Sequence, residues 1–348
     1  KINSKILFLQ FKYENILLGD LIYDSYLRFN KKHTADIASY EFKNFAYQQI
    51  LIFAYWKNIF KKNKILAIVL SHTVYSIAIP LRVAASYKIP SYIASLTSIN
   101  LYNNKRYYEL DSNALNQNFL DLNKKQKKNY LKYSKRKINE KFNPNSKFYD
   151  EISKVDELSK SIKKNKFILK NKFINNNPAY KNGKKNIIIY AHCFYDAPHV
   201  VKHLFSDFYD WLVFLGKASN ETDYNWFVKL HPHTLNPQLN KIVFDDLLKK
   251  YPKLNVLDKN ISSGEIVRYA DLILTIYGSV AFELAYFKKK VLLGSPYTHY
   301  ENYNFCLQPK SKKEYLYAIK NLDKMKEKFD KKEIYKFYLN STLSYFNP

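Results

Sequence analysis

Short apolar runs alternate with helix-like segments after residue 185, and this alternation constrains the fold more than any other feature of the sequence. The apolar runs, rich in β-branched and aromatic residues, lie at 187–191, 226–230, 254–257, 272–276 and 291–293. Segments with helical spacing of apolar residues separate them at 203–215, 242–251, 264–269 and 279–287. Strands and helices that alternate through short loops predict a doubly wound parallel sheet. Polar residues at the carboxyl ends of its strands are then the first candidates for a functional site.

The first half of the chain has a weaker pattern of the same α/β class. Strands are expected at 6–9, 67–70 and 89–93, and an aromatic-rich helix at 42–60. The length of 348 residues suggests two domains, because a typical domain has about 150 residues. The predicted divisions are an N-terminal α/β domain at 1–121 and a basic helical segment with a linker at 122–185. A C-terminal α/β domain follows at 186–310, and C-terminal helices at 311–348.

The net charge of +27 comes from 57 Lys and Arg residues against 30 Asp and Glu residues. The chain is also 17% aromatic, and this excludes a disordered polybasic protein because such chains lack the apolar surface for a core. Only five of the cations are arginine, the residue that readers of DNA bases favour. We therefore predict no nucleic-acid partner and ascribe the lysines mainly to codon drift, with a polyanion-binding protein as the alternative.

No apolar run reaches the length of roughly 18 residues that spans a bilayer. The two cysteines are too few for a disulfide framework, so a cytoplasmic location is expected. The excess of lysine, concentrated in 122–185, suggests peripheral contact with the anionic inner membrane.

Gly278 and Ser279 follow the predicted strand 272–276 and begin the next helix. A Gly-Ser pair there offers backbone N–H groups and a hydroxyl to phosphate oxygens. The alternative is that the pair only caps the helix and binds no ligand, and the pair by itself does not decide between these two roles.

Histidines follow the first two predicted strands of this half of the chain. His192 and Asp196 come after 187–191, and His231-Pro232-His233 follows 226–230. In a parallel sheet these residues reach the same edge as Gly278-Ser279, where an imidazole can stabilise a leaving phosphate. Zinc is the rival use of these histidines, but their spacing matches no common zinc motif, so no metal is predicted.

Three segments together resemble the nucleotide-binding half of bacterial GT-B glycosyltransferases that build capsules and lipopolysaccharide. They are Lys229-Leu230-His231-Pro232, the stretch 270–283 with Tyr277-Gly278-Ser279 and Glu283, and Lys290-Val291-Leu292-Leu293. The sequence is most similar to Kdo transferases and sialyltransferases, which have a His-Pro motif and a Ser-bearing loop around CMP. Residues 19–28 resemble the N-terminal region of capsule-biosynthesis proteins.

The resemblance implies a GT-B fold, with two Rossmann-like domains facing a cleft, and a role for each matching residue. His231 would contact the CMP phosphate and aid its departure, Pro232 would fix the loop, Gly278 and Ser279 would bind phosphate, and Glu283 would hold the ribose. His192 and Asp196 complete the predicted nucleotide site.

A base on the N-terminal domain would take the acceptor proton. Asp20 is the first candidate and Asp24 the second; the alternative roles are a helix N-cap for Asp20 and a surface position for Asp24. His72, just after the predicted strand 67–70, is a candidate for the acceptor site.

These expectations define a metal-independent enzyme that needs no cofactor beyond its donor. It would transfer an acidic sugar, Kdo or a nonulosonic acid, from a CMP-sugar to a surface polysaccharide or a lipid-linked glycan. A CDP-glycerol or polyol phosphotransferase of teichoic-acid-like polymers is the alternative enzyme. A non-catalytic carbohydrate-binding protein is the alternative outside catalysis.

Overall fold

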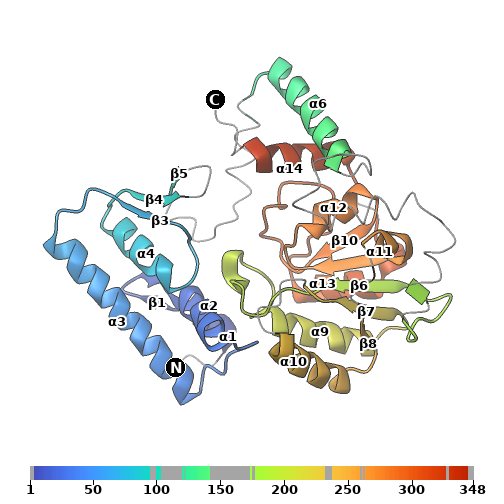
Figure 1. Cartoon of the computed structure of the whole chain (residues 1–348), viewed down its shortest axis with the longest axis horizontal. Helices are drawn as coiled ribbons and strands as arrows, with labels where there is room; N and C mark the ends of the chain where they lie inside the picture. The colour runs from blue at the N-terminus through green and yellow to red at the C-terminus, as the bar shows by residue number, and fades with distance from the viewer. Residues whose placement is uncertain are drawn as a thin grey trace. The chain divides into compact units, whose positions relative to one another are not determined.

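The computed structural model describes residues 4–94, 99–102, 120, 122–141, 173–174, 177–231, 237–258, 261, 263–326 and 329–343. Contacts divide the chain into two compact units. The first contains Lys1–Asp111 and Cys193–Leu212, and the second contains Ser112–His192 and Val213–Pro348. Residues 193–212 therefore pack with the N-terminal half, although the sequence analysis grouped them with the C-terminal domain. Both units contain helices and a sheet, which confirms an α/β protein of two parts (Figure 1).

The first unit is built around two helices whose apolar faces meet. Helix α2 (Gly19–Asn30) is almost wholly buried, and α3 (Tyr40–Lys62) begins at the N-cap Ser39, whose hydroxyl accepts from the Phe42 N–H. Phe42 of α3 packs edge-on against Tyr26 of α2. The long helix predicted at 42–60 is thus confirmed. The other helical elements of this unit are α1 (Lys5–Leu9), η1 (Ser76–Ala78), α4 (Ile79–Ser86) and η2 (Pro198–Val200).

Two small sheets complete the first unit. Strands β3 (Ile68–Leu70) and β4 (Ser91–Ala94) pair in parallel, and β5 (Ile99–Leu101) adds to β4 in the antiparallel sense. A hairpin of β1 (Lys12–Tyr13) and β2 (Ile16–Leu17) lies before α2. The strand predicted at 6–9 is wrong, because these residues form α1. Ser4 caps that helix, and Phe8 and Leu9 are buried while Ile6 and Leu7 are exposed, a pattern without strand alternation.

The second unit contains the predicted parallel sheet. Its strands are β6 (Asn186–Tyr190), β7 (Asn225–Lys229), β8 (Leu254–Val256), β9 (Leu272–Thr275) and β10 (Lys290–Leu293). They lie in the order β10-β9-β6-β7-β8, and all neighbours are parallel. Numbered along the chain this is the Rossmann order 3-2-1-4-5, in which the strand order reverses between β6 and β9. The five strands predicted from the sequence are therefore confirmed to within one or two residues.

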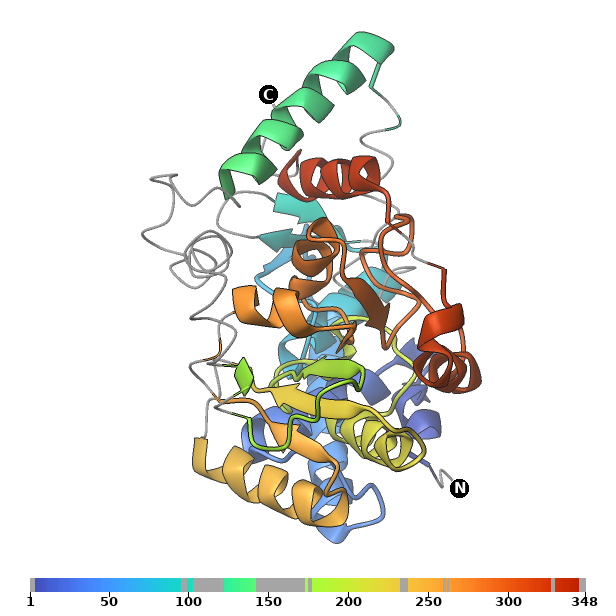
Figure 2. The same cartoon turned by 90° about the vertical axis from the view of Figure 1, so that its right-hand side faces the viewer.

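Helices connect these strands at α9 (Phe208–Asn220), α10 (Pro237–Lys250), α11 (Ser263–Tyr269) and α12 (Val280–Tyr286). Helix α9 begins five residues later than predicted. Asp207 sets that start, because its carboxylate accepts from the Asp210 N–H at 2.7 Å and its carbonyl from the Trp211 N–H. The order of the strands puts α11 and α12 on the opposite face of the sheet from α9 and α10 (Figure 2).

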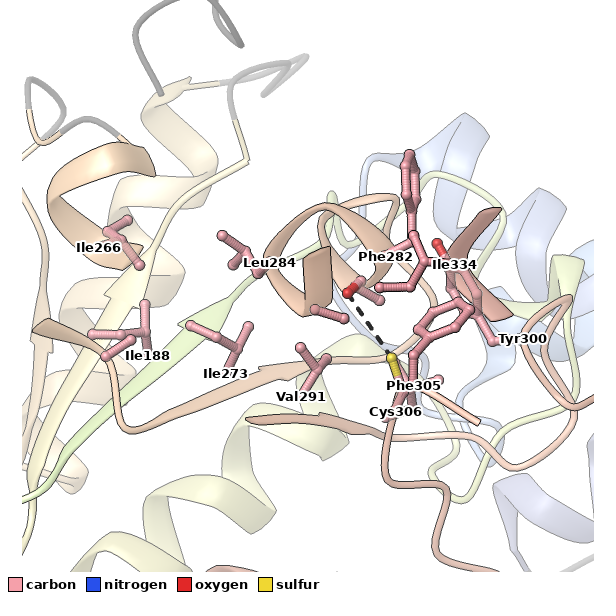
Figure 3. Close-up of a cluster of buried hydrophobic side chains, with 14 of the residues drawn as sticks. Ile188, Ile266, Ile273, Phe282, Leu284, Val291, Tyr300, Phe305, Cys306 and Ile334 are labelled. Carbon is pink, nitrogen blue, oxygen red and sulfur yellow. Dashed lines mark hydrogen bonds between the residues drawn. The ribbon is translucent and has the colours of Figure 1, made fainter. Parts of the chain in front are cut away.

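One hydrophobic cluster joins the sheet to α11 and α12 (Figure 3). Ile188 and Ile273 are paired across β6 and β9, so both point to the same face. They pack with Ile266 of α11 and Leu284 of α12, and the cluster continues to Tyr300 and Phe305 in the C-terminal segment. This core fixes the start of α12, and with it the loop that carries Gly278 and Ser279.

Two further helices cover the same side. Helix α6 (Lys124–Lys141) lies in the predicted basic segment 122–185 and packs against α14 (Lys331–Leu343), as both views show. Residues 142–172 of that segment lie outside the described residues. The buried Ile138 of α6 joins the cluster with Ile334 of α14. The C-terminal segment also contains α13 (Lys312–Lys320) and η3 (Leu322–Lys324). Among the described residues no helix is long and apolar enough to cross a membrane.

Candidate functional site

The candidate site lies in the second unit, where the strand order reverses. Ile189 of β6 pairs with Leu274 of β9, and Tyr190 of β6 pairs with Lys229 of β7. His192 comes two residues after Tyr190, and His231 comes two residues after Lys229. The two histidines therefore follow neighbouring parallel strands at the same level. The end of β9 leads into Gly278 and Ser279 at the same edge. The register therefore brings together three of the loops that the sequence analysis singled out, at the position where doubly wound sheets bind their ligands.

His192 is held by the end of β9. Its Nε2 accepts from the Ile276 backbone N–H at 3.2 Å and lies 3.1 Å from the Thr275 hydroxyl oxygen. An acceptor Nε2 requires the tautomer with its hydrogen on Nδ1. Burial, followed by a positive charge on His231, lowers the pKa of His192 to about 3. The lowered pKa favours a neutral His192 at pH 7, with Nδ1 as the donor nitrogen.

Thr275 links His192 to the glycine of the loop. Its side chain is fully buried, and its hydroxyl oxygen accepts from the Gly278 N–H at 3.4 Å while the hydroxyl hydrogen is available to His192 Nε2. A Cβ on Gly278 would lie 3.0 Å from that oxygen and 3.7 Å from His192 Cε1. A side chain at this position would therefore crowd the Thr275 hydroxyl, because the loop passes so close to it. On the other side, the buried Tyr300 hydroxyl donates to the Gly278 carbonyl at 3.1 Å.

Ser279 and Glu283 extend from this loop. Ser279 is exposed, and its hydroxyl caps no backbone N–H of α12. Glu283 is half-buried one turn later. Helix α12 has seven residues and is shorter than the predicted segment 279–287. Because so short a helix has only a small dipole, the side chains and the backbone around Gly278 are the main groups that the site offers to an anion.

The residues after β7 are described only as far as His231. Its imidazole is half-buried and close enough to His192 to influence that residue's pKa. Lys229, at the end of β7, donates to the Ile261 carbonyl at 2.6 Å and so ties β7 to the loop after β8. Pro232 and His233 lie outside the described residues, and the predicted role of Pro232 stays a prediction.

The predicted base belongs to the first unit and is not exposed there. Asp20 is 4% exposed, and its two carboxylate oxygens each accept from the Arg82 guanidinium at 2.6 Å. Arg82 also donates to the Leu17 carbonyl. This bidentate geometry favours a structural role for Asp20, since both of its oxygens are already hydrogen-bonded. His72, the candidate for the acceptor site, is exposed.

Asp24 and Asp196 also lie in the first unit. Asp24 is buried and accepts from His199 twice, from the ring Nδ1 at 2.5 Å and from the backbone N–H at 3.0 Å. Asp196 instead contacts Arg28 and Tyr75. The structure thus groups Asp196 with residues of the N-terminal half, whereas the sequence analysis assigned it to the nucleotide site with His192.

Sequence analysis did not single out Thr275, Tyr300 or Arg82. Thr275 is the one polar residue of the apolar strand β9, and that position was the available signal. Arg82 had a compositional signal, because arginine is scarce in this chain. Tyr300 had none, since tyrosine occurs 32 times.

Within the described residues, no group of three or more His, Cys, Asp or Glu side chains is placed to hold a metal ion. The polar groups at this edge of the sheet are the imidazoles of His192 and His231, the Ser279 hydroxyl and the Glu283 carboxylate. Such a set suits a phosphate or a nucleotide.

No protein-family model and no curated protein matches this sequence. Similar solved structures include the UDP-GlcNAc 2-epimerase of Neisseria meningitidis bound to UDP-GlcNAc, at 13% identity and a TM-score of 0.35, over 89% of this chain and 83% of that one. The UDP-GlcNAc 2-epimerase of Methanocaldococcus jannaschii has 14% identity and a TM-score of 0.38, over 83% and 78%. KpsC of Thermosulfurimonas dismutans, a β-Kdo 2,7 transferase, has 14% identity and a TM-score of 0.40, over 90% and 85%. These neighbours handle nucleotide sugars or transfer Kdo, but at such TM-scores the function of this chain has to be argued from its own site.

Proposed function

We propose that this protein is a glycosyltransferase that uses a CMP-sugar, and that the second unit binds the nucleotide at the carboxyl ends of β6, β7 and β9. The observation that carries the proposal is the linkage of His192, Thr275 and Gly278, which fixes the loop at the carboxyl edge of the sheet and leaves the Ser279 hydroxyl exposed. Neutral His192, Ser279 and His231 would contact phosphate, and Glu283 would contact ribose hydroxyls.

The reaction would join an acceptor hydroxyl to the anomeric carbon of the donor. The acceptor oxygen forms the new bond, the bond from the anomeric carbon to the phosphate oxygen breaks, and CMP leaves with that electron pair. The acceptor proton passes to a base. Hydrogen bonds from His231 and Ser279 would stabilise the charge that grows on the phosphate.

The donor sugar in this proposal is Kdo or a nonulosonic acid, and the acceptor is a surface polysaccharide or a lipid-linked glycan. Helix α6 supports a peripheral contact with anionic lipid. It carries nine Lys and Arg residues against one Glu, and Lys124, Lys125, Lys128, Lys132 and Lys135 are exposed. Since its apolar residues pack against the rest of the unit, α6 would act through charge rather than insertion.

A thermal-shift screen with CMP, CDP, UDP, GDP and ADP tests the nucleotide. Binding to the folded state raises the melting temperature by mass action. We expect the largest rise with CMP, and a response to UDP or GDP alone would overturn the proposal.

Release of CMP from CMP-Kdo, a CMP-nonulosonic acid and CDP-glycerol then tests the reaction. Release from either CMP-sugar supports the transferase. Release from CDP-glycerol alone would identify the polyol phosphotransferase instead. Binding of CMP with no release from any donor, in the presence of acceptor-containing membranes, would identify a non-catalytic protein.

A further inference from the structure

A second cluster of polar side chains belongs to the first unit. Asp196 Oδ1 accepts from Arg28 Nη1 at 3.3 Å and from the Tyr75 hydroxyl at 3.1 Å. The Arg28 guanidinium also lies over the Tyr75 ring, 5.7 Å from its centroid. The side chains of Arg28 and Asp196 are 37% and 60% exposed, so a ligand can reach both.

Much of the hydrogen-bonding capacity of this cluster is unused. Among the described residues, none donates to Asp196 Oδ2, and Arg28 gives only one of its five N–H groups to Asp196. The cluster therefore offers a carboxylate acceptor next to several guanidinium donors. A sugar hydroxyl needs this combination, because it donates one hydrogen bond and accepts others. A phosphate would meet the repulsion of the Asp196 carboxylate.

The backbone around the cluster is strained. Tyr75 has φ 60° and ψ −175°, a region that residues other than glycine rarely adopt. Ala197, next to Asp196, is left-handed at φ 43° and ψ 63°. Such conformations cost about 1–3 kcal/mol each and concentrate at functional sites, where the surrounding structure holds them in place. Two of them within one small cluster point to a geometry kept for a ligand.

Buried residues hold these side chains in position. His199, two residues beyond Ala197, is fixed by its two hydrogen bonds to Asp24 of α2. The backbone after Tyr75 is fixed by the Ser76 N–H, which donates to the Ser25 hydroxyl at 2.6 Å. Burial and the Asp196 carboxylate raise the pKa of Tyr75 above its usual range, so its hydroxyl remains a donor. The exposed groups thus stand on a rigid support.

We propose that Asp196, Arg28 and Tyr75 form a sugar-binding site that recognises a pair of neighbouring hydroxyls. Asp196 Oδ2 accepts from one or both hydroxyls, and the spare Arg28 N–H groups donate to their oxygens. This proposal rests on the transferase function given above, under which the bound sugar is part of the acceptor glycan. This assignment replaces the predicted role of Asp196 in binding the nucleotide.

Saturation-transfer NMR of the full-length protein with methyl glycosides of galactose, glucose, N-acetylglucosamine and N-acetylgalactosamine tests the site. We expect at least one of these neutral sugars to bind. Asp196→Asn and Arg28→Lys should each weaken that binding about tenfold, since each loses a charge-assisted or forked hydrogen bond. Glu14→Gln is the matched control. It removes an exposed carboxylate from an ion pair with Lys57 in the same unit and should not alter sugar binding.

CMP binding, measured on the same variants, separates this proposal from the nucleotide site. We expect Asp196→Asn to retain the wild-type affinity for CMP, and a parallel loss of CMP binding would overturn the assignment. Absence of binding by all four glycosides, or equal binding by the wild type and both variants, would overturn the sugar site itself. If the wild type binds sugars through Asp196 but fails to bind CMP, the transferase function falls and the sugar site stands.

Discussion

Asp20 and Arg82 form a bidentate ion pair in the interior of the first unit. Each oxygen of the Asp20 carboxylate lies 2.6 Å from a different nitrogen of the guanidinium. The pair joins α2 to α4, and its side chains are 5% and 1% exposed. Because neither charge has access to water, each depends on the other for compensation.

We expect Asp20→Asn and Arg82→Met each to lower the free energy of unfolding by about 3–5 kcal/mol, because each leaves an uncompensated buried charge. The double variant Asp20→Leu with Arg82→Met should recover most of that loss, since an apolar pair of similar volume removes both charges. Urea denaturation of the three variants measures the effect. A double variant no more stable than the singles would contradict this view of the pair.

The double variant also tests Asp20 as the catalytic base, separately from its effect on folding. A folded double variant that still releases CMP from the donor onto acceptor would exclude Asp20 as the base. Loss of transfer, with stability restored and CMP binding unchanged, would support the prediction made from the sequence.

His192 should make stability fall in acid. Its pKa is lowered to about 3 in the folded state, whereas an unfolded histidine titrates near 6.5. Between these two pH values the unfolded chain therefore binds more protons than the folded chain. The stability associated with His192 is fully present above pH 6.5, where the residue is neutral in both states, and it is lost as the pH falls toward 3. Near pH 4.5 the loss should be about 2–3 kcal/mol.

His192→Gln is the variant that measures this, because the glutamine carbonyl can take the place of Nε2 as an acceptor for the Ile276 N–H. The difference in stability between pH 7 and pH 4.5 should be smaller in the variant than in the wild type. His299, whose pKa burial lowers to about 4, acts in the same direction but is present in both proteins and cancels. Equal pH dependence of the two proteins would contradict the buried neutral state of His192.

The strands of the second unit were predictable because a buried parallel strand is apolar along its whole length. The stretches 187–189 of β6 and 272–274 of β9 are such runs, and each strand is followed by a polar loop. The same signal misled at Lys5–Leu9, where a short apolar run forms a helix capped by Ser4. Periodicity over so few residues does not separate the two structures.

The contents of the site were less predictable than its location. Strand ends and loops placed His192, His231, Gly278 and Ser279 at one edge, as the register confirms for the strands that carry them. The contacts of Asp196 and Asp20 depend on residues far away in the sequence, at Tyr75 and Arg82. No spacing rule within a single sequence gives such pairs, so sequence analysis placed Asp196 with its chain neighbour His192.

Gly278→Ala should weaken nucleotide binding with a modest loss of stability. The new Cβ would lie 3.0 Å from Thr275 Oγ1, so that hydroxyl must shift by a few tenths of an ångström and its contact with His192 is disturbed. We expect a loss of about 1 kcal/mol in stability and about a tenfold loss in CMP affinity. Gly183→Ala is the control. With φ +80° and open space around it, that change should cost similar stability through backbone strain alone, and leave CMP binding intact.

The two serines Ser279 and Ser311 are expected to differ in role, with ligand binding by the Ser279 hydroxyl and helix capping by the Ser311 hydroxyl. Ser311 accepts from the Glu314 N–H at 3.2 Å at the start of α13, whereas Ser279 makes no such bond at the start of α12. Ser311→Ala should therefore cost about 1 kcal/mol of stability and leave the affinity for CMP unchanged. Ser279→Ala should do the reverse, with stability within about 0.5 kcal/mol of the wild type and CMP affinity lowered about tenfold. Thermal denaturation of both variants, with and without CMP, measures both effects. Equal CMP affinity in the two variants would show that the Ser279 hydroxyl is no part of the nucleotide site.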